Sequence, residues 1–154
     1  HMAETAYLEA LDHFDGRSII ASHSNPRRFV DTDRHLSDEM ILRLAERDGV
    51  IGIVIYNLFL NPDWRSGDPK ANVPFTTVID AIDSICQLTG SAAHVGIGSD
   101  FDGGFGVEST PEGVDTIADL WSIGGALRER GYAPADIEAI LGGNMLRKLR
   151  QILP

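Results

Sequence analysis

The sequence predicts an α/β fold in which three parallel strands with flanking helices form the C-terminal portion of a (β/α)8, or TIM-type, barrel. Three apolar segments predict the strands, at residues 18–21, 50–56 and 93–99. Segments with helical spacing of apolar residues separate them, and this alternation predicts parallel strands joined by right-handed crossovers. Three strands are too few to close a barrel, so we expect residues 1–154 to be one part of a barrel domain.

The composition limits the class of protein. The chain has 154 residues, a formal net charge of −10 and a single cysteine. An acidic chain argues against nucleic acid as a partner, because phosphate binding requires a basic surface. No apolar run is long enough to span a bilayer, and one cysteine cannot form an internal disulfide. We therefore expect a soluble, cytoplasmic protein that binds neither nucleic acid nor membrane.

The first helix and strand lead to a polar segment. Residues 3–15 carry apolar side chains at helical spacing, and Gly16 predicts the end of that helix. The strand at 18–21 runs into small polar residues around His23. An imidazole at such a strand end can bind a metal while a neighbour holds its second nitrogen. A lone histidine is more often structural, so both interpretations stay open at this point.

A charged loop follows at residues 26–36, and it contains Arg34 and His35. A guanidinium here can pair with a substrate carboxylate in a planar fork, or the loop can simply be solvated. Ser37 predicts a helix N-cap, because acidic residues fill the next turn and an apolar helical face follows. Gly49 predicts the end of that helix.

The segment 50–56 is the clearest strand in the sequence. It is apolar on both faces and rich in β-branched residues, which is typical of a covered parallel sheet. Tyr56 ends it, and the loop at 57–74 has the length of a lid or a binding loop. A helix is expected at 75–88, where Cys86 lies on the apolar side as a packed thiol rather than a nucleophile.

The third strand, at 93–99, alternates branched residues with glycines, so one face has room for close neighbours. Asp100 follows it directly, and Asp102 with the two glycines after it predicts a turn. Working acids of α/β enzymes lie at such strand ends, although an ordinary Asp-Gly turn with a capping carboxylate is an equal alternative. In one parallel sheet, His23, Tyr56 and Asp100 would share the barrel face where the strands end.

Helical spacing predicts three further helices, at residues 114–130, 134–141 and 144–153. Pro134 suits the first turn of the second of them. The glycine pair at 142–143 predicts a break before the last.

Four motifs, in order along the chain, resemble the C-terminal half of the renal (membrane) dipeptidase family of zinc metallopeptidases. They are Ile20-Ala21-Ser22-His23-Ser24-Asn25, Arg34-His35-Leu36-Ser37-Asp38-Glu39-Met40, Gly98-Ser99-Asp100-Phe101-Asp102-Gly103 and Leu141-Gly142-Gly143-Asn144. The resemblance covers nearly the whole chain and implies an amidohydrolase-like barrel. It also implies a binuclear zinc site that hydrolyses dipeptides with a free C-terminal carboxylate.

The resemblance implies two metal ligands in this chain. His23 matches the ligand histidine that follows a barrel strand. His1 matches a second ligand, because relatives have a similar His-Met-Ala-Glu segment before a helix. His1-Met2 also has the form of an expression-vector remnant, so the origin of His1 stays open.

The resemblance also implies three residues that meet the substrate. Arg34 matches the arginine that binds the substrate carboxylate, and Tyr56 would line the pocket. Asp100 matches the acid that contacts the substrate amine and transfers protons during hydrolysis. His35 stands where the family leads us to expect Asn or Gln, so we assign it no role.

The number of ligands limits the expected activity. The family's His-x-Asp after a first strand and its bridging glutamate do not occur here, and two zinc ions need several protein ligands. We therefore expect a zinc dipeptidase as the parent protein and an inactive chain on its own. This chain would form a homo-oligomer or pair with the missing N-terminal half.

Two alternatives stay open. The chain can be a catalytically dead dipeptidase-like module that serves binding or assembly. It can also belong to another amidohydrolase-type metal hydrolase, although a carboxylate-binding Arg34 argues against that.

Overall fold

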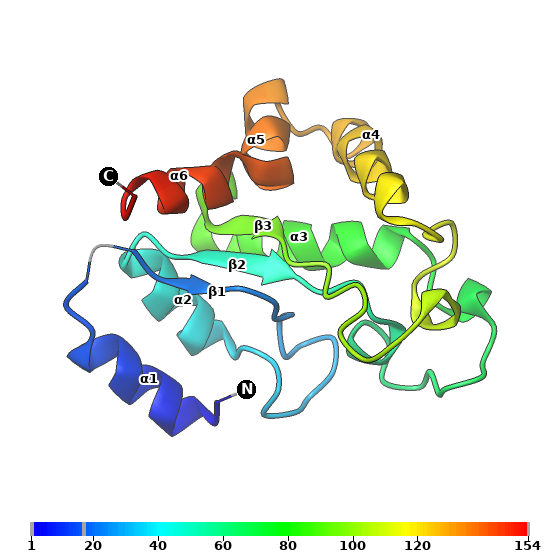
Figure 1. The fold of residues 1–154 in the computed structure, drawn as a ribbon, viewed down its shortest axis with the longest axis horizontal. Coiled ribbons are helices and arrows are strands. Elements are labelled where there is room, and N and C mark those ends of the chain that lie inside the picture. Colours follow the sequence, from blue (N-terminus) through cyan, green and yellow to red (C-terminus); the bar gives the residue numbers. More distant parts are fainter. Residues whose placement is uncertain (1, 17, 154) are drawn as a thin grey trace.

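The centre of the structure is a three-stranded parallel sheet with helices on both faces (Figure 1). The structure is a computed structural model that describes residues 2–16 and 18–153. Strands β1 (Ile20–Ala21), β2 (Val50–Ile53) and β3 (Val95–Ile97) lie in the order β1-β2-β3. Ile20 pairs with Val50 and Ile51 with Val95, both in parallel register. The predicted order and direction of the strands are confirmed, although each strand is shorter than the sequence predicts.

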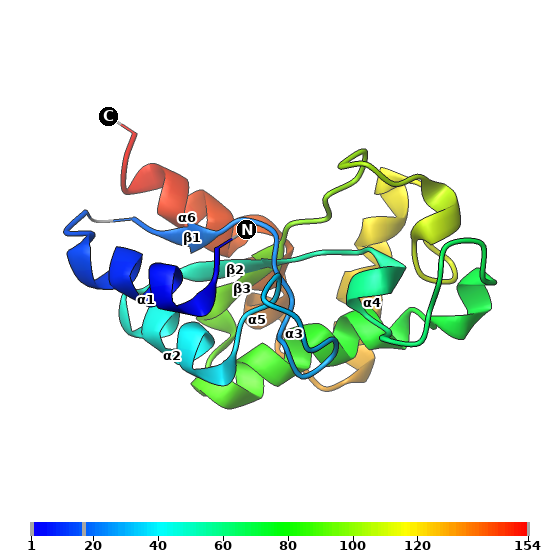
Figure 2. The same ribbon diagram turned by 90° about the horizontal axis from the view of Figure 1, so that it is seen from below.

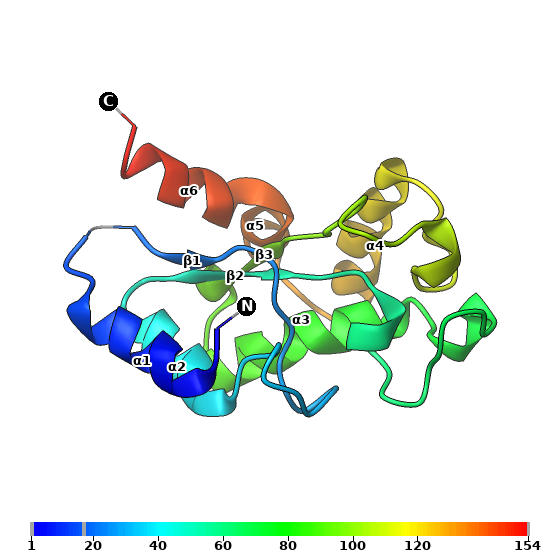
Figure 3. The same ribbon diagram turned by 60° about the horizontal axis from the view of Figure 1, so that its bottom comes forward.

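Helices cover both faces of the sheet (Figures 2 and 3). On one face lie α1 (Glu4–His13), α2 (Asp38–Glu46) and α3 (Thr76–Thr89), and on the other α5 (Pro134–Glu138) and α6 (Asn144–Arg150). The hydroxyl of Ser37 accepts a hydrogen bond from the Met40 N–H, so Ser37 is the predicted N-cap of α2. None of the helices in the described residues is long and apolar enough to cross a bilayer.

The core lies mainly between β2 and the helices α2 and α3. All four residues of β2 are buried, which fits a strand covered on both faces. The buried apolar side chains of the two helices are Met40, Ile41, Leu44, Val78, Ile79, Ala81, Ile82, Ile85 and Cys86. Burial raises the pKa of the Cys86 thiol, as expected for a packed cysteine.

The single helix predicted at 114–130 is wrong. A 3-10 turn (Ile117–Trp121) precedes α4 (Ser122–Glu129) instead. Thr116 and Asp119 form a capping box, which starts the helical turns at Ile117 rather than at residue 114. Ile117 and Trp121 are 64% and 76% exposed, so they do not form the apolar face that the spacing predicts.

The last helices follow the prediction more closely. Pro134 stands in the first turn of α5, and a wide turn at Ala139–Gly143 separates α5 from α6. The chain kinks at Gly142, at the predicted break.

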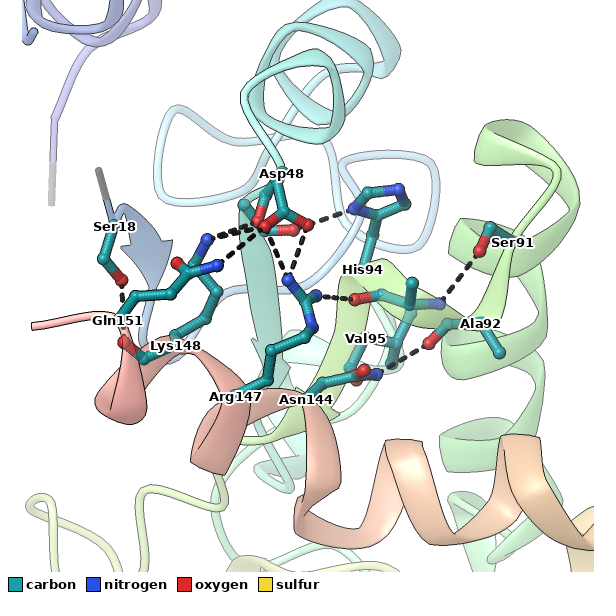
Figure 4. A network of polar contacts seen from close by, with 12 residues as sticks. Ser18, Asp48, Ser91, Ala92, His94, Val95, Asn144, Arg147, Lys148 and Gln151 are labelled. Carbon is teal, nitrogen blue, oxygen red and sulfur yellow. Dashed lines mark hydrogen bonds and ion pairs between the residues drawn. The ribbon is translucent and has the colours of Figure 1, made fainter. Parts of the chain in front are cut away.

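Polar side chains join α6 to the segments where β2 and β3 begin: Asp48 precedes β2, and Asn144 contacts the start of β3 (Figure 4). The Asp48 carboxylate accepts two hydrogen bonds of 2.6 Å from Arg147. Lys148, whose side chain is 3% exposed, donates to the Asp48 carbonyl at 2.7 Å and to its carboxylate at 3.1 Å. Asn144 donates to the backbone carbonyls of Ala92 and Val95. We call Asp48, Asn144, Arg147 and Lys148 the amino-end clasp, because they hold the sheet where its strands begin.

Candidate active site

The candidate site lies where the three strands end. Backbone atoms of Ser22, Gly52 and Gly98 form its floor. A Cβ atom built on Gly52 would lie 2.1 Å from the Ser22 carbonyl oxygen, and one on Gly98 would lie 2.0 Å from the same atom. Since real side chains cannot approach so closely, only glycine fits at either position. The predicted close approach on the glycine face of the third strand is therefore confirmed.

Asn25 fixes the segment that leads into the site. It is fully buried, accepts from the Val54 N–H at 2.9 Å and donates to the Val54 carbonyl at 3.1 Å. Its amide also donates to the Phe59 carbonyl at 3.2 Å. This side chain replaces a strand ladder, which is why β2 ends earlier than predicted.

Three groups hold the Arg34 guanidinium. It donates to the His23 carbonyl at 2.9 Å and to the Ser24 hydroxyl at 3.3 Å. Its Cζ atom lies 5.1 Å from the centre of the Phe59 ring, a cation–π contact. Burial lowers the pKa of Arg34, and the negative charge of Asp100 opposes this shift. Arg34 is therefore a fixed, partly desolvated cation, which is the arrangement that suits a carboxylate ligand.

His23 and Arg34 line one pocket of about 370 Å³, which extends between α1, β1 and α2. The Ser22 hydroxyl lies 2.6 Å from His23 Nδ1, a contact that can fix the orientation of the imidazole ring. Met2 and Tyr7 line the same pocket from the N-terminal segment. His1, the second predicted metal ligand, lies outside the described residues.

Tyr56 belongs to an aromatic cluster beside Arg34 rather than to the lining of that pocket. Its ring lies 4.9 Å from Phe59 in an edge-to-face contact and is stacked on Phe105 at 4.4 Å. This cluster connects the loop after β2 with the loop after β3. Tyr56 thus supports the Phe59 ring on which the Arg34 guanidinium lies.

Asp100 begins a tight turn three residues after the end of β3 at Ile97. It has a left-handed backbone conformation, with φ of 60°, and its carbonyl accepts from the Gly103 N–H at 2.9 Å. A Cβ atom on Gly103 would lie 2.4 Å from the Asp100 carboxylate and 2.8 Å from the Asp100 carbonyl oxygen, and the backbone contact favours glycine there. A strained residue at a strand end often marks a functional position. Asp100 influences Arg34 electrostatically but forms no ion pair with it within 4.0 Å among the described residues.

The structure therefore links the predicted residues through Arg34. The Arg34 guanidinium donates to the His23 carbonyl, and it lies over the Phe59 ring, which Tyr56 also contacts. The charge of Asp100 affects the pKa of Arg34. The sequence analysis missed Ser24 and Phe59, both of which touch Arg34. The signal for Phe59 is its spacing of three residues from Tyr56, which places the two rings on the same side of the 3-10 turn at Asn57–Phe59.

A metal centre is not complete in the described part of the chain. Within residues 2–16 and 18–153, no three His, Cys, Asp or Glu side chains are grouped so that they could hold a metal ion. His23 is the ligand that the sequence predicts here, and one imidazole does not make a zinc site. These residues alone do not fit a binuclear centre.

Comparison with known proteins identifies the family. The family model described as membrane dipeptidase (peptidase family M19) matches residues 1–153. A dipeptidase of Aspergillus terreus is 33% identical over 152 residues, which is 99% of this chain and 35% of that protein. A protein of Klebsiella pneumoniae, described as an uncharacterized protein in the pqqA 5′ region, is 30% identical over 99% of this chain and 53% of its own length.

A solved structure is similar in fold along nearly the whole chain. It is a metallo peptidase from Rhodobacter sphaeroides liganded with a phosphinate mimic of the dipeptide L-Ala-D-Ala. The TM-score is 0.84 and the identity 25%, over 99% of this chain and 41% of that one. The chain thus spans about half or less of the length of these relatives.

Proposed function

The chain belongs to the membrane dipeptidase family, peptidase family M19, and from this premise we propose that it forms the carboxylate-binding and proton-transfer part of a zinc-dependent dipeptidase. The complete enzyme would hydrolyse dipeptides that have a free C-terminal carboxylate. In this proposal, residues 1–154 are the C-terminal part of the barrel domain.

The environment of Arg34 is the observation that carries this proposal. The Ser24 hydroxyl, the His23 carbonyl and the Phe59 ring fix the guanidinium at the wall of a pocket. Two of its five N–H donors are used in these hydrogen bonds, and a planar fork can offer the remaining donors to a carboxylate. Arg34 would hold the C-terminal carboxylate of the dipeptide and so orient the peptide bond.

Asp100 would act on the other end of the substrate. Its carboxylate would bind the substrate amine and take a proton from the attacking water as the water oxygen bonds to the carbonyl carbon. The same proton would then pass to the leaving amine as the C–N bond breaks, which completes hydrolysis without a further reactant. Tyr56 would support the aromatic wall beside the substrate.

His23 would contribute one ligand to zinc, and the contact of Ser22 with Nδ1 would orient its ring. When bound, a zinc pair would polarise the scissile carbonyl and lower the pKa of water. The described residues do not supply enough ligands, so we propose that the remaining ones lie outside them and that the 154-residue chain alone is inactive.

Zinc content tests this proposal. After dialysis, we expect the 154-residue chain to keep less than one zinc per chain and the full-length protein to keep about two. The variant His23→Ala in the full-length protein should lose zinc, whereas His13→Ala, at the end of α1, should not. Equal zinc content in both variants would contradict the ligand role of His23.

Paired ligands test the carboxylate clamp. The full-length protein should bind a dipeptide at least tenfold more tightly than the corresponding dipeptide amide, since a lost charge-assisted contact of this kind costs about 1.4 kcal/mol or more. Arg34→Gln should abolish the difference. Arg28→Gln is the matched control, because Arg28 lies in the same loop and is paired with Asp38 at 2.8 Å. Isothermal titration with a dipeptide analogue whose scissile amide is replaced by a methylene-amine, so that it cannot be hydrolysed, gives both affinities. Equal binding of this analogue and its C-terminal amide by the wild-type protein would refute the clamp.

A catalytically inactive binding module is the second candidate function. This alternative is consistent with the described residues, which contain no group of His, Cys, Asp or Glu side chains that could hold a metal ion. A full-length protein that binds dipeptides but neither keeps zinc nor hydrolyses the peptide bond would establish this alternative.

We also propose that this chain associates with another polypeptide segment or with a second copy along β1. Strand β1 is at an edge of the sheet, and Ile20 is 45% exposed between two pockets. Leu146, Leu149 and Ile152 expose further apolar surface beside it. Light scattering would show association, and a monodisperse monomer that unfolds cooperatively would count against it.

A further inference from the structure

His35 is a buried polar side chain without an evident structural reason. Its relative exposure is 0%, and neither Nδ1 nor Nε2 has a hydrogen-bond partner among the described residues. The backbone of His35 is fixed independently, since its N–H donates to the Thr32 carbonyl and its carbonyl accepts from Arg27. Two unsatisfied nitrogens destabilise a fold relative to an apolar ring, so the imidazole calls for another explanation.

The ring of His35 packs against Phe59, the residue whose ring the Arg34 guanidinium lies over. The centres of the His35 and Phe59 rings lie 4.8 Å apart at an interplanar angle of 83°, an edge-to-face contact. The Arg34 guanidinium lies 5.1 Å from the centre of the Phe59 ring. Tyr56 contacts Phe59 as well, at 4.9 Å and 72°. Phe59 is therefore held by two aromatic side chains while Arg34 lies on it.

Burial and nearby positive charges keep the His35 ring neutral. Burial is the largest cause, and together with the positive charges of Arg34 and Arg27 it lowers the pKa of His35 to about 4. Arg27 is itself paired with Glu4 at 2.7 Å and lies 3.9 Å from Asp33, and Asp100 acts on Arg34. At neutral pH the imidazole can thus pack as an aromatic ring beside two cations without adding a third.

We propose that His35 is a positioning residue for the carboxylate clamp, because its ring holds Phe59 in the orientation that supports the Arg34 guanidinium. This inference rests on the proposed function only for the identity of the ligand. The packing of His35, Phe59 and Arg34 is a property of the chain itself, and it can be tested without any ligand.

Two substitutions separate the ring from its bulk. His35→Phe keeps an aromatic edge and removes both unsatisfied nitrogens, whereas His35→Leu keeps apolar bulk and removes the ring. Phe59→Leu removes the ring between His35 and Arg34. His13→Leu is the matched control, because His13 is an exposed histidine at the end of α1.

The first readout is the NMR signal of the Arg34 guanidinium in the 154-residue chain, assigned by its loss in Arg34→Lys. A guanidinium over a ring face experiences a ring-current shift to high field. We expect this shift in the wild-type chain, in His35→Phe and in His13→Leu, and its loss in His35→Leu and Phe59→Leu. A shift that persists in His35→Leu would overturn the proposal, even if His35→Phe failed to fold.

The second readout is the ratio of dipeptide to dipeptide-amide affinity in the full-length protein, measured with the non-hydrolysable dipeptide analogue and its amide. We expect His35→Leu to lower this ratio about tenfold with unchanged amide affinity, the scale of a lost aromatic and cation–π contact. His35→Phe should restore it to within about twofold of the wild type. If the wild-type protein shows no preference for the dipeptide, the clamp itself is refuted while the NMR result still decides the role of His35. An unchanged ratio in His35→Leu would overturn the proposal.

Discussion

The two ends of the parallel sheet use polar side chains in opposite ways. At the amino end, the clasp residues bind one another and the backbone: Arg147 and Lys148 donate to Asp48, and Gln151, outside the clasp, donates to the same carboxylate (Figure 4). At the carboxyl end, buried polar atoms of His35, Asn57 and Trp64 lack partners among the described residues. In (β/α) folds the amino end typically serves stability and the carboxyl end serves chemistry. Within the described residues, this sheet follows the pattern in where its polar groups are paired: they are satisfied at the amino end and partly unpaired at the carboxyl end.

The largest expected effect is a loss of turnover from a substitution at the carboxyl end of the sheet. Asp100→Asn in the full-length enzyme should reduce turnover roughly a hundredfold or more, the scale of a general acid–base, while zinc content and thermal stability stay unchanged. Asparagine tolerates the left-handed conformation of Asp100, so the turn should survive. Asp102→Asn is the control, because Asp102 has φ of 62° in the same turn. Similar losses in both variants would mean that the turn, not the Asp100 carboxylate, matters.

A smaller effect should appear at the amino end and leave the chemistry intact. Asp48→Asn removes the counter-charge of the buried Lys148, and we expect a loss of about 2 kcal/mol in the free energy of unfolding. The value lies below the usual range for broken buried pairs because Asp48 is half exposed. Urea denaturation measures it. Asp80→Asn, which removes an exposed partner of Arg130, should change stability by less than about 0.5 kcal/mol.

Substrate binding should respond to a subtler change at the carboxyl end. Arg34→Lys keeps the charge and loses the planar fork, so we expect KM for a dipeptide to rise about tenfold with a smaller change in kcat. Steady-state kinetics of the full-length enzyme, with Arg28→Lys as the control, measure both constants. An unchanged KM would show that charge alone suffices at this position.

The smallest expected effect is a difference between the two ends of the sheet in how the free energy of unfolding depends on pH. His35 has a folded-state pKa of about 4 against an ordinary value of 6.5, so the unfolded chain binds this proton first as the pH falls. Its neutral state therefore contributes stability at high pH, and we expect about 1 kcal/mol of it to be lost between pH 7 and pH 5.5. His35→Phe should remove this part of the pH dependence, as followed by urea denaturation at each pH.

The amino end should respond in a different pH range. Hydrogen bonds from Gln151, Lys148 and Arg147 hold the pKa of Asp48 below its ordinary value of 3.8 despite burial, which opposes them. The stability that Asp48 contributes is present above pH 3.8 and is lost as the pH falls through its lower folded-state pKa.

A pH profile of His35→Phe in which the free energy of unfolding still falls by the wild-type amount between pH 7 and 5.5 would contradict the assignment to His35.

Local patterns in the sequence predict much of the scaffold. The β-branched run at 50–56 predicts a buried central strand, and Ser37 predicts the start of α2, because both signals depend on neighbouring residues. The start of the turn at Ile117 does not follow from apolar spacing. It depends on the Asp119 carboxylate, which accepts from the N–H groups of Asp115 and Thr116 and competes with helical bonding.

The candidate site is less accessible to such reasoning. Charge and motif order single out Arg34, but its partners Ser24 and Phe59 come from separate loops that meet only in the folded chain. The resemblance gives His35 no role, because the family has Asn or Gln at that position, and a histidine beside an arginine carries no local signal of burial or ring packing. The links between loops, rather than the residues within one loop, are what the sequence leaves undetermined.

The glycines under the Ser22 carbonyl limit how this site can change during evolution or engineering. Any side chain at Gly52 or Gly98 would displace Ser22 and, through it, the imidazole of His23. Single substitutions of Gly52 or Gly98 are therefore expected to disrupt the site rather than change its specificity. A library that varies the loops at 57–74 and 101–116 while keeping both glycines would explore new substrates without moving the floor on which they are positioned.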